Sequence, residues 1–177
     1  VDAIVAPTVA IANAPSSPLG TLEVSEECDV VITYNPKIVN DPPLLVATFA
    51  HELAHYLTGA CTEAPPGGWE NWEFATDITA TFLGFGIFMT NSAFSFTQFS
   101  NVDSQGWRSN RNGYLTESEH VFALGLFLRL KEQKPEKAFP HLKPHLRKLL
   151  KNALKEIDTM NIIPDLKRVE FVGYDLL

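Results

Sequence analysis

Residues 43–59 of the chain read PLLVATFAHELAHYLTG, and this stretch decides how the rest of the sequence is interpreted. Leu45, Phe49 and Leu53 recur every four residues, as they do on one face of an α-helix. A proline at the start and a glycine at the end suit the two ends of such a helix. The pattern therefore predicts a helix over residues 43–58.

The predicted helix carries the motif His51-Glu52-Leu53-Ala54-His55, which has the form HExxH. On a helix, the two histidines lie about 40° apart around the axis and about 6 Å apart along it, so both imidazoles reach one point. Zinc accepts imidazole nitrogens at about 2.0–2.1 Å and keeps room for a third protein ligand and a water. Glu52 is turned by about 100° from His51, where it can take a proton from that water. We therefore predict one Zn²⁺ site with Glu52 as the catalytic base.

A third metal ligand is expected from the next predicted helix, which extends from about Trp69 to Met89. Glu70, Glu73 and Asp77 share one face of this helix. Either glutamate has the right chemistry for the ligand. The opposite face carries the apolar residues expected to be buried, namely Phe74, Ile78, Phe82 and Phe85.

With these residues in place, the sequence resembles the gluzincin metallopeptidases, in which HExxH is followed on a second helix by a glutamate and, four residues later, an aspartate. The corresponding segment is Glu73-Phe74-Ala75-Thr76-Asp77. The resemblance implies that Glu73 rather than Glu70 is the third zinc ligand. It also implies that Asp77 accepts a hydrogen bond from the outer nitrogen of a ligating histidine, most readily His51. Trp72 is a departure, because many gluzincins have asparagine before the glutamate.

The resemblance covers roughly residues 21–90. The strand-like VVITYNP before ATFAHELAHYL is similar to the compact gluzincins, such as the IrrE/ImmA-like and M48-like peptidases, in which an edge strand beside the HExxH helix holds an extended substrate. The resemblance thus implies a zinc-dependent peptidase that binds a peptide or protein substrate and hydrolyses an internal peptide bond.

The reaction also needs a donor that stabilises the oxyanion. We favour Tyr114, with His120, Arg108 and Arg111 as alternatives.

Two other functions stay open because residues 91–177 match no pattern specific to these peptidases. The first is a metallopeptidase-like module that binds zinc and regulates or contacts partners without proteolysis. The second is a metal hydrolase that acts on a non-peptide amide. Screening a peptide library with metal-loaded protein separates the first of these from a peptidase.

The remaining sequence predicts an α+β fold with a small mixed sheet, an edge strand beside the HExxH helix and about four helices. Residues 1–20 resemble a linker-like lead-in, and residues 21–177 a single metallopeptidase-like domain. The other predicted elements are the strands Thr21–Val24, Val30–Tyr34, 94–97 and 169–172 and two further helices. The first of these helices opens with the capping box Thr116-Glu117-Ser118-Glu119 and runs to about Lys134, and its buried side is expected to carry Val121, Leu124, Gly125 and Leu128. The second starts near Pro144, and its expected apolar face consists of Leu146, Leu149, Leu150, Ala153, Leu154 and Ile157.

Composition excludes some functions. The net charge of −7 argues against a nucleic-acid partner, and no apolar run is long enough for membrane insertion. The basic residues of the last helix are expected to be solvated. Cys28 and Cys61 are expected to be free thiols, although one disulfide is the alternative, and a cytoplasmic location is weakly favoured. The chain begins with Val1, so a leader or another domain can precede it. The sequence does not indicate the oligomeric state.

Overall fold

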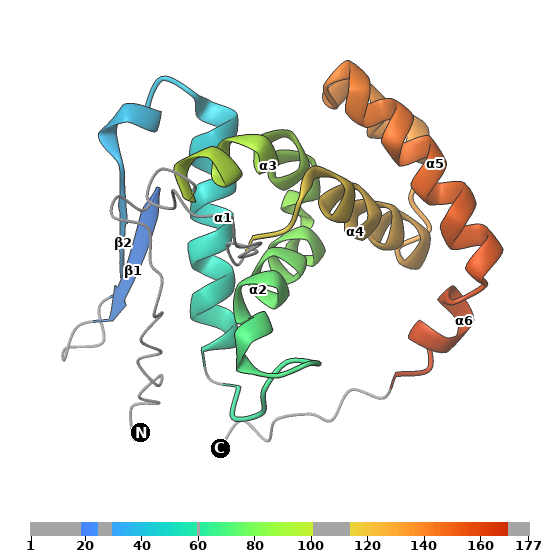
Figure 1. The fold of residues 1–177 in the computed structure, drawn as a ribbon, viewed down its shortest axis with the longest axis horizontal. Coiled ribbons are helices and arrows are strands. Elements are labelled where there is room, and N and C mark those ends of the chain that lie inside the picture. Colours follow the sequence, from blue (N-terminus) through green and yellow to red (C-terminus); the bar gives the residue numbers. More distant parts are fainter. Residues whose placement is uncertain (1–18, 25–29, 60, 101–113, 170–177) are drawn as a thin grey trace, which may run out of the picture.

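The computed structural model describes residues 19–24, 30–59, 61–100 and 114–169. Within these ranges the protein is α+β, mostly helical, with one two-stranded antiparallel sheet. Figure 1 shows the order of the parts across the molecule: the sheet, then α1, then α2 and α3, then α4, with α5 on the outside. The predicted fold class is confirmed at this level, but the sheet is antiparallel rather than mixed.

Strands β1 (Gly20–Val24) and β2 (Val30–Tyr34) form the sheet, with Gly20 opposite Tyr34. Both strands were expected, β2 from its β-branched sequence, although β1 begins one residue earlier than predicted. Strand β1 packs against α1, and the ring of Tyr34 meets the ring of Phe49 edge to face at 5.7 Å. The sheet therefore lies directly beside the helix that carries the HExxH motif.

Helix α1 (Pro42–Thr58) begins where Asp41 caps the amide of Leu44 at 3.2 Å. Its buried face differs from the expected one. Leu53 and Leu57 are 39% and 55% exposed. Apart from Leu44 in the first turn, the buried face consists of small residues and the polar part of the motif: Ala47, Thr48, Ala50, His51, Glu52 and Ala54. The alanines let α3 and α2 pack closely on this face, so the motif turns inwards, whereas Leu53 and Leu57 turn outwards.

The helix expected over residues 69–89 is divided into several elements. A 3-10 turn, Trp69–Asn71, leads into α2 (Trp72–Ala80), a π-helical segment (Thr81–Phe85) and α3 (Gly86–Ser100). Gly84 has a φ of 104° and makes the break possible, because glycine adopts this backbone conformation without a steric penalty. Ile78, expected to be buried, is 43% exposed.

The strand predicted over residues 94–97 is wrong, because α3 continues through it. A short alternation of phenylalanine with serine or threonine is ambiguous by itself, and here an established helix that packs between α1 and α4 extends across it. The strand predicted over residues 169–172 falls almost entirely outside the described residues.

Helix α4 (Glu117–Leu130) opens with the predicted capping box, in which Thr116 and Glu119 bond each other's backbone amides at 3.4 and 2.8 Å. It ends four residues earlier than expected. It packs against α5 (Pro144–Met160), whose predicted apolar face is buried and whose basic residues are all exposed, as expected. The short helix α6 (Ile163–Leu166) brings the α-helices of the described chain to six rather than about four. Two further 3-10 turns, Pro135–Lys137 and Phe139–His141, join α4 to α5, and Pro36–Ile38 precedes α1.

The described helices all fall short of the length and apolar character that a membrane span requires. Cys61 is half-buried, and Cys28 lies outside the described residues, so the pairing of the two cysteines stays a prediction.

Candidate metal centre

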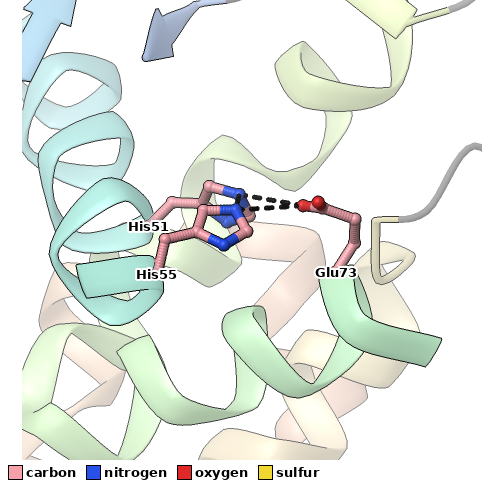
Figure 2. A group of neighbouring side chains, drawn as sticks. All are labelled: His51, His55 and Glu73. Carbon is pink, nitrogen blue, oxygen red and sulfur yellow. Dashed lines mark hydrogen bonds and ion pairs between the residues drawn. The ribbon is translucent and has the colours of Figure 1, made fainter. Parts of the chain in front are cut away.

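Three side chains from α1 and α2 converge on one point (Figure 2). The Nε2 atoms of His51 and His55 lie 3.0 Å apart. Oε2 of Glu73 lies 3.2 Å from the first and 3.3 Å from the second. Ligand atoms placed about 2.0–2.1 Å from a tetrahedral ion are roughly 3.3–3.4 Å from one another. The three atoms thus already have nearly the spacing that one ion requires, and the group can hold a metal ion.

The carboxylate of Glu73 supports this interpretation. Both of its oxygens are buried, and no well-aligned hydrogen bond reaches them from the described residues, although the two ring nitrogens are close. Burial by itself would raise the pKa of Glu73, but the two imidazoles lower it to about 2. A buried, ionised carboxylate without full hydrogen bonding is costly unless a cation compensates it. Its chemistry therefore fits a cation bound between the three side chains.

Glu70, the alternative ligand, does not join this group. It is exposed in the turn before α2, and its carboxylate folds back beside Gly68. Glu73 follows Glu70 by three residues, about one helical turn, and only Glu73 faces the two histidines.

His51 is held from behind by Asp77. Its Nδ1–H donates to Oδ1 of Asp77 at 2.9 Å, which leaves Nε2 facing the centre of the group. The second oxygen, Oδ2, accepts the backbone N–H of Leu115 at 2.9 Å and lies 3.5 Å from Nε2 of His120. All three side chains are almost fully buried. Burial lowers the pKa of His51, but Asp77 and Glu73 outweigh it and raise this pKa to about 10.

His55 has a different environment and is 18% exposed. Its outer nitrogen, Nδ1, accepts the indole N–H of Trp72 at 3.2 Å and lies 3.4 Å from the hydroxyl of Thr76. The ring of Trp72 in turn lies 5.4 Å from the ring of Trp69. No carboxylate orients His55 from behind among the described residues.

Glu52 lies on the side of α1 that faces the sheet. A Cβ atom at Gly20 would lie 3.1 Å from Oε1 of Glu52 and 2.7 Å from a methyl of Thr48, so only glycine fits here without displacement. Strand β1 thereby shields Glu52, which is 8% exposed. Burial, supported by the charge of Glu73, raises the pKa of Glu52, whereas the two histidines oppose this rise.

Tyr114 is next to the group, with its ring 5.3 Å from that of His51. Burial and the carboxylates of Glu73, Asp77 and Glu52 raise the pKa of Tyr114. The phenol therefore keeps its proton at neutral pH and can act as a hydrogen-bond donor. Of the alternative donors, Arg108 and Arg111 lie outside the described residues. His120 is buried against Asp77 rather than solvated, and burial lowers its pKa.

Sequence reasoning missed four contributors: Gly20, Trp72, Thr76 and the contact of His120 with Asp77. A signal existed only for His120. It lies four residues before Leu124 and eight before Leu128, and both leucines were expected on the buried face of α4.

Comparisons of the chain with known protein families, with curated proteins and with solved structures found no match. The site itself is therefore the basis for assigning a function.

Proposed function

We propose that the chain is a zinc-dependent hydrolase that cleaves peptide bonds, with His51, His55 and Glu73 as the metal ligands. The observation that carries the proposal is the triangle of ligand atoms with sides of 3.0, 3.2 and 3.3 Å, flanked by Glu52 from the same turn of α1. A metal ion bound there would polarise the scissile carbonyl and acidify the attacking water.

The protein residues supply the proton transfers. Glu52 takes a proton from the attacking water and delivers it to the leaving amine. The raised pKa of Glu52 favours the first of these transfers, because a carboxylate with a raised pKa is a stronger base towards the attacking water. The hydroxyl group of Tyr114 would donate a hydrogen bond to the developing oxyanion, and Asp77 fixes the orientation of His51.

The neighbouring sheet supports a peptide as substrate. In the described chain β1 and β2 pair only with each other, so each has an open edge of backbone donors and acceptors. An extended peptide can add to such an edge. Since β1 approaches Glu52 at Gly20, a peptide along β1 would pass beside the catalytic base.

The replacement Glu52→Gln tests the proposal. We expect a loss of peptide hydrolysis of about 1,000-fold while one metal ion per chain is retained, because amide nitrogen and oxygen cannot act as the base. Hydrolysis is measured with a peptide library and metal content by mass spectrometry, which also distinguishes zinc from iron, since two histidines and a carboxylate suit both.

The control variant is Glu63→Gln, an exposed glutamate in the loop after α1, which should keep full activity. Full activity of the Glu52→Gln protein would refute the role of Glu52. Wild-type protein that binds zinc but cleaves no peptide would instead favour a zinc-binding interaction module.

A further inference from the structure

The charges of the chain are unevenly distributed along its sequence. Of the 14 lysines and arginines, 11 lie in residues 129–168, although the chain as a whole has a net charge of −7. Within that region, residues 137–155 contain six lysines and arginines and no aspartate or glutamate. An otherwise acidic protein therefore has one region with a local excess of positive charge.

Helix α5 collects four of these cations on its solvent side. At 100° per residue they span an arc of about 100° and about 12 Å of helix length. We call them the basic stripe: Arg147, Lys148, Lys151 and Lys155. All four are exposed, and α5 lies on the outside of the molecule (Figure 1). The opposite, apolar face of α5 packs against α4, so the stripe faces away from the core.

The basic stripe has no acidic partner in the part of the chain that the structure describes. Arg147 bonds a backbone carbonyl, and Lys151 lies over an aromatic ring, but none of the described carboxylates forms an ion pair with the stripe. Lys167, in contrast, pairs with Glu132 at 2.7 Å. The positive charge of the stripe is thus left uncompensated, whereas a neighbouring cation is paired.

The stripe also works against helix formation. Cations three or four residues apart on a helix repel one another, and cations near the N-terminal end are disfavoured by the helix dipole. Helix α4 has the favourable order, with Glu117 and Glu119 in its first turn and Arg129 in its last. Helix α5 has no acidic residue in its first turn and carries Arg147 and Lys148 close to it. The stability of the fold therefore does not account for the stripe.

The position of the stripe favours one class of anionic partner. A peptide binds most readily in a cleft, but none of the four side chains lines the cavity beside Asn91 or the cavity beside Phe122. In the major groove of DNA, about 12 Å wide, phosphates flank an inserted helix on both sides. One flank of the stripe instead carries Asn152 and Glu156. A flat anionic surface touches only the outermost line of a helix, which is where the cations of the stripe lie.

We propose that the basic stripe docks the protein on a membrane surface that contains anionic phospholipids. The contact is electrostatic and peripheral, because the apolar face of α5 is already covered by α4 and cannot enter the bilayer. Each lysine or arginine near such a surface strengthens binding by about 5-fold. This role depends neither on the metal centre nor on hydrolysis, so it goes beyond the proposed function.

Co-sedimentation of the full chain with lipid vesicles measures the docking. At about 0.1 M NaCl we expect binding to phosphatidylcholine vesicles that contain about 30% phosphatidylserine, and at least about 10-fold weaker binding to pure phosphatidylcholine vesicles. Raising the salt to about 0.5 M should abolish the binding, because exposed charges are then screened over a few ångströms.

Matched variants locate the contact on α5. Lys148→Gln/Lys151→Gln should bind anionic vesicles about 25-fold more weakly, because two charges of the stripe are lost. Lys148→Arg/Lys151→Arg keeps both charges and should bind like the wild type. The control Lys37→Gln/Lys167→Gln removes the same net charge from exposed residues outside α5 and should change binding by less than about 2-fold. Circular dichroism checks that each variant is folded.

Four results would overturn the proposal. The wild type could fail to bind anionic vesicles, or it could bind both kinds of vesicle equally. The control variant could lose as much binding as the stripe variant. The protein could also bind fluorescently labelled poly-uridylate or poly-glutamate through the stripe while it ignores anionic vesicles, which would assign the stripe to a different class of partner.

Discussion

His51 and His55 lie one helical turn apart and face the same carboxylate, yet the protein surrounds them differently. Behind His51 is Asp77, which is 1% exposed and also bonds the backbone just before α4. Behind His55 are a tryptophan and a threonine from the first turns of α2, and the imidazole is 18% exposed. One histidine is part of the core, whereas the other lies at its margin.

The difference indicates how the proposed metal site can be both rigid and adjustable. Asp77 of α2 connects His51 on α1 to the backbone of Leu115 and to His120 at the start of α4. Moving this ring would disturb the core, which resists such displacement because it is closely packed. The neighbours of His55 are weaker hydrogen-bonding partners, so small changes there should tune affinity, whereas changes behind His51 should reduce affinity and stability together.

The largest effect on zinc affinity is expected when the carboxylate of Glu73, which faces both histidines, is removed. Glu73→Gln should weaken zinc binding by at least about 100-fold, because it removes one of three protein ligands and its charge. Glu70→Gln, three residues earlier and exposed, should leave affinity unchanged. Isothermal titration calorimetry checks both. Equal losses in the two variants would contradict the choice of Glu73.

The next effect is the pH dependence of zinc affinity, which follows from the proton on His51. Because its pKa is raised to about 10, zinc must displace a proton from His51 at neutral pH. Apparent affinity should rise about tenfold per pH unit between pH 6 and pH 8, with about one proton released per ion. Titrations in buffers of different ionisation enthalpy measure that release, and its absence would contradict the prediction.

The raised pKa of His51 also makes the stability of the metal-free protein depend on pH. A pKa raised in the folded state stabilises the fold fully below the ordinary value near 6.5, and this contribution is lost as the pH rises through about 10. Unfolding of chelator-treated protein should therefore become easier over that window.

Asp77→Asn tests the anchored side of the comparison. We expect zinc binding to weaken by about 30-fold and the free energy of unfolding to fall by about 2–4 kcal/mol, because a buried charge that orients His51 is lost. Asp158→Asn is the control, since Asp158 pairs with Arg129 on the surface at 2.6 Å and should matter little to either quantity. A stable Asp77→Asn protein with wild-type affinity would remove the distinction between the two histidines.

The smallest effect concerns His120. His120→Phe keeps a ring in the core but removes the nitrogen 3.5 Å from Asp77, so zinc affinity should fall only about 3-fold. His145→Phe removes another histidine–carboxylate pair, with Glu117 at 3.1 Å, far along the chain from the metal ligands, and should leave affinity unchanged. Competition with a chelator measures the zinc affinities of the two variants. Equal affinities would show that Leu115 orients Asp77 and that His120 does not contribute.

Local patterns predicted much of the architecture because neighbours in sequence determine them. The hairpin strands, the capped start of α4 and the buried leucines of α5 all follow from turn chemistry and periodicity. The break at Gly84 and the continuation of α3 through residues 94–97 did not, since a tolerated glycine and a short alternating run are decided by what packs around them.

The sequence alone determined that His51, Glu52 and His55 share a helix and that two glutamates and an aspartate follow on the next, because helical geometry converts spacing into direction. Only the tertiary structure decided that Glu73 rather than Glu70 meets the histidines, that α1 turns Leu53 and Leu57 outwards, and that Trp72 and Thr76 both contact Nδ1 of His55. Those outcomes depend on the distance between α1 and α2 and on how each helix is rotated about its axis. The packing of the small alanines of α1 and the buried Asp77 set both quantities, and no local sequence pattern encodes them.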